Sequence, residues 1–162
     1  MPEDPYLALK ARIEDELCSL ERICQGMREA LERAGEAPEE YDVRAVATYV
    51  DDFYTGCERL FEQVAVQLDG NLPGGADWHL KLQRQMTRPV PEVRPACISA
   101  ELAERLDPYR RFRHRVRHRY GFGLDWEPVR ELAEGMPALL AELRAALREF
   151  GRWLESQGAD KR

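Results

Sequence analysis

The stretch Tyr109-Arg-Arg-Phe-Arg-His-Arg-Val-Arg-His-Arg-Tyr120 concentrates six arginines and two of the three histidines of the chain in twelve positions. No acidic residue lies among them. The whole chain has a formal charge of −6, so this stretch carries +6 and the other 150 residues carry −12. Such a concentration of cations is costly unless a polyanion or an acidic partner neutralises it. The stretch therefore predicts a surface that binds nucleic acid or an acidic protein.

The apolar residues of this stretch predict that it forms a helix. They fall at spacings of 3, 4 and 4, which is the period of one helical face: Tyr109, Phe112, Val116 and Tyr120. This face should pack against a core, while the arginines and histidines cover the rest of the helix. Gly121 follows as a stop signal, so the cations are also expected near the negative end of the helix dipole.

Apolar residues recur at the same period on both sides of the basic stretch. They predict five helices, four of them long, over about residues 5–34, 39–69, 77–86, 99–120 and 125–154. Capping residues stand at four of the expected helix starts: Asp4, Asp77, Ser99 and Asp125. Val, Ile and Thr are scarce, which points away from sheets. We therefore expect an all-α, up-and-down bundle of about five helices in a single domain over residues 1–162.

Three segments rich in glycine or proline punctuate this pattern. Gly70–Gly75 is the clearest break in the chain. Arg88–Pro95 contains three prolines, which forbid a helix and indicate an extended strap across the surface. Gly135-Met-Pro137 should kink or interrupt the last helix.

The sequence is typical of a cytoplasmic protein. Its N-terminus, Met1-Pro-Glu-Asp-Pro-Tyr6, lacks the basic and then apolar profile of a signal peptide. No uninterrupted apolar run approaches the ~18 residues of a membrane span, so no membrane partner is expected. The four cysteines show no Cys-x-x-Cys spacing, and Cys24 and Cys57 fall on apolar helix faces. We therefore expect buried free thiols and no disulfide in a reducing cytosol.

A tighter pattern lies within the basic stretch: Arg113, four residues, His118, one residue and Tyr120, with the polar His114 directly after the arginine. This string resembles the signature of the HEPN superfamily, and more narrowly that of the HepT-like toxins of toxin–antitoxin pairs. The similarity extends through Trp78–Met86 and Phe122–Trp126. The resemblance implies a HEPN-like helical bundle that acts as a dimeric, metal-independent endoribonuclease and is silenced by a nucleotidyltransferase antitoxin.

Arg113 and His118 have the side chains that such chemistry needs. RNA is cleaved without a metal when a base removes the 2′-hydroxyl proton and the oxygen attacks the adjacent phosphorus. A histidine, with a reference pKa of about 6.5, suits the proton transfer. An arginine binds phosphate through two parallel hydrogen bonds and stabilises the developing charge. Five residues on a regular helix separate the two side chains by about 140°. They can converge at a cleft edge, where the helix ends near Gly121, or across a dimer axis that brings in a second copy. The resemblance to HEPN proteins implies the last arrangement, so we predict a homodimer.

The remaining polar residues of the stretch receive supporting roles. Five arginines are predicted to bind RNA phosphates without base selectivity: Arg110, Arg111, Arg115, Arg117 and Arg119. His114 is a supporting residue of the site. His114 and His118 have the spacing of two metal ligands on a helix, but the surrounding arginines would repel a divalent cation. Neither a metal nor a cofactor is therefore expected.

Other interpretations remain open at this stage. The basic helix also fits a non-enzymatic interaction module that binds nucleic acid or an acidic partner. Tyr120 completes the apolar helix face as a core residue, whereas the resemblance to HepT-like toxins implies that it accepts AMP groups from the antitoxin. His79, alone on a short helix, is assigned no function. Acidic residues of the first two helices, such as Asp51-Asp52, are interpreted as solvated faces.

Overall fold

The computed structural model describes residues 3–118 and 123–160, without the side chains of Arg117 and His118. Five α-helices lie in these residues, and the described part contains no strand beyond an isolated bridge. They are α1 (Pro5–Ala34), α2 (Glu40–Val64), α3 (Trp78–Met86), α4 (Ala100–His118) and α5 (Trp126–Ala159). The predicted all-α bundle of five helices is confirmed. Gly121 lies outside the described residues.

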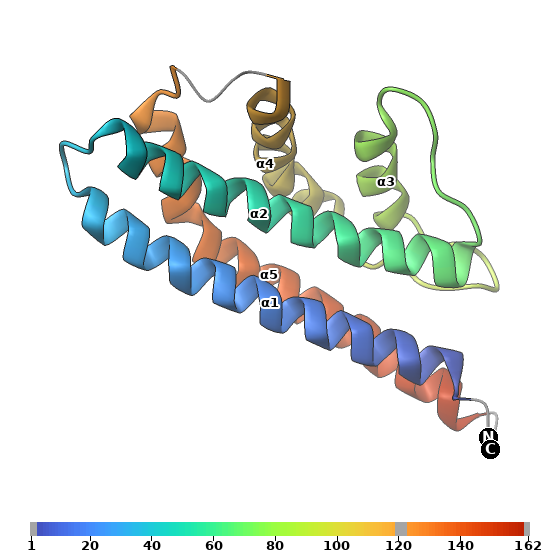
Figure 1. The fold of residues 1–162 in the computed structure, drawn as a ribbon. Helices are drawn as coiled ribbons and strands as arrows, with labels where there is room; N and C mark the ends of the chain where they lie inside the picture. Colours follow the sequence, from blue (N-terminus) through green and yellow to red (C-terminus); the bar gives the residue numbers. More distant parts are fainter. Residues whose placement is uncertain (1–2, 119–122, 161–162) are drawn as a thin grey trace.

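Three long helices form the body of the bundle. Beyond its first turns, α5 runs side by side with α1, so that the start of α1 and the end of α5 lie at the same end of the bundle (Figure 1). Helix α2 packs on both of them. The apolar positions of α1 are buried because they share one face at the helical period: Leu9, Ile13, Leu17, Leu20, Cys24 and Met27. All four cysteines are free, and only Cys18 is exposed.

The ends of α1 and α2 follow from local chemistry. Asp4 accepts hydrogen bonds from the backbone N–H groups of Tyr6 and Leu7 at 2.8 and 3.2 Å, as expected of an N-terminal cap. Gly35, with a φ of 61°, ends α1. Helix α2 continues into one π-helical turn, Ala65–Asp69, and stops at Gly70, which has a φ of 74°. Left-handed backbone of this kind favours glycine.

Helices α3 and α4 stand on one face of α2 instead of running along it (Figure 1). Ser99 caps α4 as predicted, since its Oγ accepts a hydrogen bond from the Leu102 N–H at 3.1 Å. Asp77 and Asp125 precede α3 and α5, but the side chain of neither makes a capping hydrogen bond. The Asp77 carboxylate instead pairs with Lys81 at 3.1 Å. These two predicted side-chain caps are therefore wrong.

The proline-rich segment 88–95 contains no helix, as predicted, but it is folded and not fully extended. Val90 and Arg94 exchange backbone hydrogen bonds of 2.9 and 3.0 Å around a tight turn. The buried Arg94 guanidinium holds Asp69, at the end of the π-helical turn that follows α2, through two hydrogen bonds of 2.6 and 2.7 Å. It also donates to the backbone carbonyl of Arg88. This ion pair fastens the segment to the bundle.

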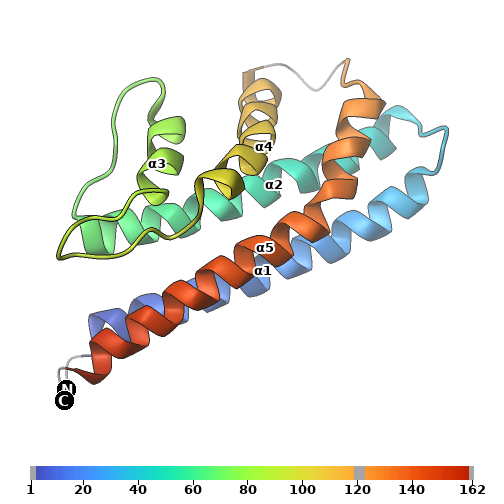
Figure 2. The ribbon, with the colours of Figure 1, turned by 180° about the vertical axis from the view of Figure 1, so that it is seen from behind.

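Helix α5 bends within a continuous hydrogen-bonded segment. Pro137 lies inside it, and Figure 2 shows its first turns at a clear angle to the remainder. Proline lacks the N–H that would bond to the preceding turn, and its ring displaces the carbonyl there. The predicted kink is therefore present without a break. No helix in the described residues combines the length and apolarity needed to cross a membrane.

Candidate functional site

The basic helix α4 is anchored to the bundle by its aromatic face. Tyr109 and Phe112 are buried, which confirms the inward face predicted for them. The Tyr109 ring packs edge-on against Phe53, and its hydroxyl donates to the Leu132 carbonyl of α5 at 2.6 Å. A Cβ atom at Gly135 would lie 2.9 Å from that hydroxyl, so the glycine leaves room for it. These contacts set which residues of α4 face α2.

Arg113 points inward, toward two carboxylates of α2. Its Nη1 donates to Glu58 Oε1 at 2.8 Å, and its Nε lies 3.8 Å from Asp51 Oδ1. The side chains of Arg113 and Glu58 are only 12% and 6% exposed. Asp51 was expected on a solvated face, but its side chain is 17% exposed because α4 covers that part of α2. The expectation for Asp51 is therefore wrong, whereas Asp52 is exposed as predicted.

His79 belongs to the same cluster, although its sequence context gave it no function. Its Nδ1 lies 2.5 Å from Glu58 Oε2, so one carboxylate joins His79 of α3 to Arg113 of α4. An ionised carboxylate has no hydrogen to donate, so the hydrogen of this pair is assigned to Nδ1. The neighbouring Trp78 ring packs on the imidazole with the ring centres 3.7 Å apart. These two contacts hold the imidazole in one orientation.

The carboxylate of Glu62, also on α2, interacts electrostatically with the same cations. Burial and the charge of Glu58 raise the pKa of the Glu62 carboxyl, while Arg113, His79 and Arg59 act in the opposite direction. Glu58 and Glu62 are one helical turn apart, so both lie toward the face of α2 that α3 and α4 cover. The site is therefore a partly buried cluster of opposite charges.

A cavity of about 390 Å³ opens above this cluster. It is bounded by α2, α3 and α4, and its lining brings together four of the polar residues described so far: His79, Arg110, Arg113 and His114. Tyr54 and Trp78 supply aromatic walls. A cavity of this size with convergent polar groups on mainly apolar walls is typical of a small-molecule or substrate subsite.

The predicted phosphate-binding arginines that the structure describes on α4 lie at two hollows beside this helix. Arg110 and Arg111 each pair with Asp107, at 2.8 and 3.1 Å. Together with His114 and the exposed Arg115, both also line a hollow of about 500 Å³ between α4 and the start of α5. Arg110 and His114 border both hollows. The basic surface is therefore continuous across α4.

Several predicted site residues lie beyond what the structure describes. His118 is the last residue of α4, and Arg117 precedes it, but their side chains lie outside the described part. Arg119 and Tyr120 lie outside the described residues altogether. The structure thus brings Arg113, His114 and Arg110 together at one cavity. It describes no side-chain contact of Arg117, His118, Arg119 or Tyr120.

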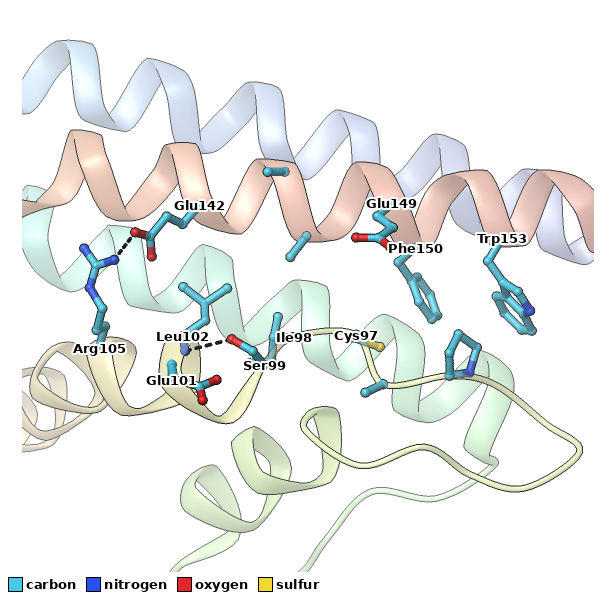
Figure 3. A pocket seen from close by; sticks show the side chains of 14 residues that line it. Cys97, Ile98, Ser99, Glu101, Leu102, Arg105, Glu142, Glu149, Phe150 and Trp153 are labelled. Carbon is cyan, nitrogen blue, oxygen red and sulfur yellow. Dashed lines mark hydrogen bonds and ion pairs between the residues drawn. The ribbon is translucent and has the colours of Figure 1, made fainter.

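Another cavity, of about 730 Å³, lies between the start of α4, residues 95–99 and the C-terminal half of α5 (Figure 3). Its walls are largely apolar, with Leu102, Phe150 and Trp153 directed into it. An ion pair between Arg105 and Glu142 borders it. None of the predicted site residues lines it. No group of three His, Cys, Asp or Glu residues in the described part is arranged to hold a metal ion.

Glu58 and His79 are the residues that sequence reasoning missed. Glu58 interrupts the apolar face of α2, four residues after the buried Tyr54 and close to the buried Phe61. An acidic residue in such a position usually has a buried partner, and this signal was available in the sequence. Nothing in the sequence joins Glu58 to His79 or Arg113, which lie 21 and 55 positions away.

Comparison with known proteins identifies the family of the chain. Neither the search of curated proteins nor that of solved structures returned a significant match. A family model described as HepT-like protein matches residues 45–154, which is more than half of the chain. The matched region contains α3, α4, most of α2 and most of α5, and thus the cluster of Glu58, His79 and Arg113. The chain therefore belongs to the HepT-like protein family.

Proposed function

We propose that this protein is the toxin of a toxin–antitoxin pair and that it acts as a metal-independent endoribonuclease. The observation that carries the proposal is the position of Arg113, the arginine of the Arg-x4-His-x-Tyr string, at a cavity that it shares with Arg110 and His114. Membership of the HepT-like family supports the same function. Exposed arginines on α4 supply the electrostatic attraction that an RNA backbone requires.

In the proposed mechanism, His118 transfers a proton and Arg113 stabilises negative charge. His118 removes the proton from the 2′-hydroxyl, and the oxygen attacks the adjacent phosphorus. Arg113 donates hydrogen bonds to the non-bridging oxygens as negative charge builds on them. Its Nη1 is bonded to Glu58, so Nη2 is the terminal nitrogen directed to phosphate in this proposal. The products are a 2′,3′-cyclic phosphate and a 5′-hydroxyl.

The active form in this proposal is a homodimer. Arg113 and His118 are five positions apart, which corresponds to about 140° on a regular helix. A two-fold axis beside α4 allows each cleft to combine groups from both copies. Sedimentation at micromolar concentration should give the mass of a dimer. A monomer that retains cleavage activity would contradict this arrangement.

The proposed means of control is AMPylation of Tyr120 by a nucleotidyltransferase antitoxin. An added AMP group near Arg113 and His118 would exclude RNA by its volume and its negative charge. Intact mass of the protein co-expressed with such a partner should show added AMP units in the parent and none in Tyr120→Phe. Tyr120→Phe should remain folded and able to cleave RNA. A modification that persists in Tyr120→Phe would show that another residue accepts the AMP group.

The decisive experiment is cleavage of a defined RNA in EDTA. The parent should cleave, and His118→Ala should lose about 10²–10⁴-fold in rate if it loses general-base catalysis. Arg113→Lys should also be slow, because lysine keeps the charge but not the paired hydrogen bonds. Arg148→Ala, which removes an exposed arginine of α5, is the matched control and should cleave like the parent.

A non-enzymatic interaction module is the second candidate function. The observation in its favour is that Glu58 and Asp51 already face the Arg113 guanidinium, while the exposed Arg111 and Arg115 remain at the surface. RNA binding without cleavage, equal in the parent and in His118→Ala and lost at high salt, would favour this function over the ribonuclease.

A further inference from the structure

Each copy of the Arg-x4-His string supplies one histidine as the base, but RNA transesterification moves two protons. One leaves the 2′-hydroxyl, and another must reach the 5′-oxygen as its bond to phosphorus breaks. An alkoxide is a poor leaving group, so protonation of this oxygen lowers the barrier. Two histidines line the cavity beside Arg113: His114, which belongs to the string, and His79, which lies outside it.

We propose that His79 is a catalytic residue of the ribonuclease and that its Nε2 donates the proton to the leaving 5′-oxygen. This inference rests on the proposed function. In the step, the 2′-O–H bond breaks as the 2′-O–P bond forms, and His118 receives that proton. The P–O5′ bond breaks, and the proton on His79 Nε2 moves to O5′. The products are the 2′,3′-cyclic phosphate and a 5′-hydroxyl, with no other reactant consumed.

The geometry supports this role in three ways. Glu58 accepts the Nδ1 hydrogen at 2.5 Å, which leaves Nε2 as the nitrogen that can exchange a proton with a substrate. The His79 side chain is 29% exposed and lines the cavity beside Arg113 and His114. The Trp78 ring restricts rotation of the imidazole. A carboxylate that holds one histidine nitrogen while the other meets the substrate is a recurring arrangement in acid–base catalysis.

Carboxylates lie close to both the imidazole and the guanidinium. Glu58 contacts Arg113 and His79 directly, and the charge of Glu62 interacts with both of them. Glu58 also holds Arg113, which means that the phosphate-binding group and the proton donor are positioned by the same side chain. Glu58 is thus the positioning residue of the pair, since it lies beneath the cavity and is buried.

The test uses two RNA substrates that differ at one atom. In the first, the leaving group is the ordinary 5′-oxygen, and in the second it is sulphur, which departs as a thiolate without a proton. His79→Ala should cleave the ordinary RNA about 10²–10⁴-fold more slowly than the parent. On the sulphur substrate its rate should return to within about tenfold of the parent rate. His118→Ala should stay slow on both substrates, because the 2′-hydroxyl proton must still be removed.

Two further variants separate catalysis from structure. His79→Gln keeps a side chain that can donate to Glu58 but cannot transfer the proton. It should therefore be slow on the ordinary RNA and recover on the sulphur substrate, which keeps the test decisive if the alanine variant unfolds. Lys81→Ala, on the exposed side of α3, should match the parent on both substrates. Equal slowing of His79→Gln on both substrates, or no slowing on either, would overturn the role of His79 while the ribonuclease function stands. A parent protein that cleaves neither RNA would overturn the ribonuclease function, and the role of His79 with it.

Discussion

Removal of the Glu58 charge should destabilise the protein strongly, because this buried carboxylate is the shared partner of Arg113 and His79. Glu58→Gln keeps the size of the side chain but leaves Arg113, whose side chain is 12% exposed, without its hydrogen-bonded counter-ion. Breaking a buried pair by removing one partner costs about 3–5 kcal/mol. At about 2–4 °C per kcal/mol for a domain of this size, the melting temperature should fall by about 6–20 °C.

A double-mutant cycle isolates the contribution of the pair. Arg113→Met removes the partner charge, so the double variant Glu58→Gln/Arg113→Met should be more stable than the sum of the single effects predicts, by about 0.5–3 kcal/mol. Urea denaturation followed by circular dichroism measures each free energy of unfolding. Glu40→Gln is the control, since its partner Arg44 lies on the exposed side of the same helix, and it should melt like the parent. Additive effects within about 0.5 kcal/mol would refute the reasoning.

Three further predictions concern the rest of the bundle. Asp69→Asn should cost about 3–5 kcal/mol, because Arg94 is fully buried against it, and limited proteolysis should then cut within residues 88–95; an uncut segment would contradict the account. Of the four thiols, only Cys18 should react with a thiol reagent in the native protein, and all four should react in urea. Burial raises the pKa of Cys24 to about 11 and that of Cys97 to about 12 from 9.0. Between pH 9 and these values the unfolded chain loses protons that the folded chain keeps, so the free energy of unfolding should fall as pH rises there; a flat profile would contradict the burial of these thiols.

The helices could be predicted from the sequence because their signals are local. Asp4 and Gly35 mark the ends of α1, and the buried face between them repeats at the helical period. The same period predicted that Tyr109 and Phe112 face inward. Asp77 and Asp125 mark helix starts correctly, but whether an aspartate caps the backbone or pairs with a lysine depends on side-chain geometry that spacing does not specify.

The site could be predicted only in part. Arg113 was identified from its own helix, whereas its partners Glu58 and Asp51 lie on α2 and depend on how α4 crosses that helix. His79 comes from a third helix, and its link to Glu58 is a contact between residues 21 positions apart. Periodicity describes each helix separately and says little about crossing, so the charge cluster required the three-dimensional structure.

The end groups of RNA fragments formed in EDTA test the central claim most directly. If α4 carries a metal-independent ribonuclease site, the purified parent should yield fragments that end in a 2′,3′-cyclic phosphate and begin with a 5′-hydroxyl. Preparations of His118→Ala should yield neither. Fragments with a 5′-phosphate, cleavage that stops when divalent metal is removed, or equal cleavage by His118→Ala would contradict the assignment of this site.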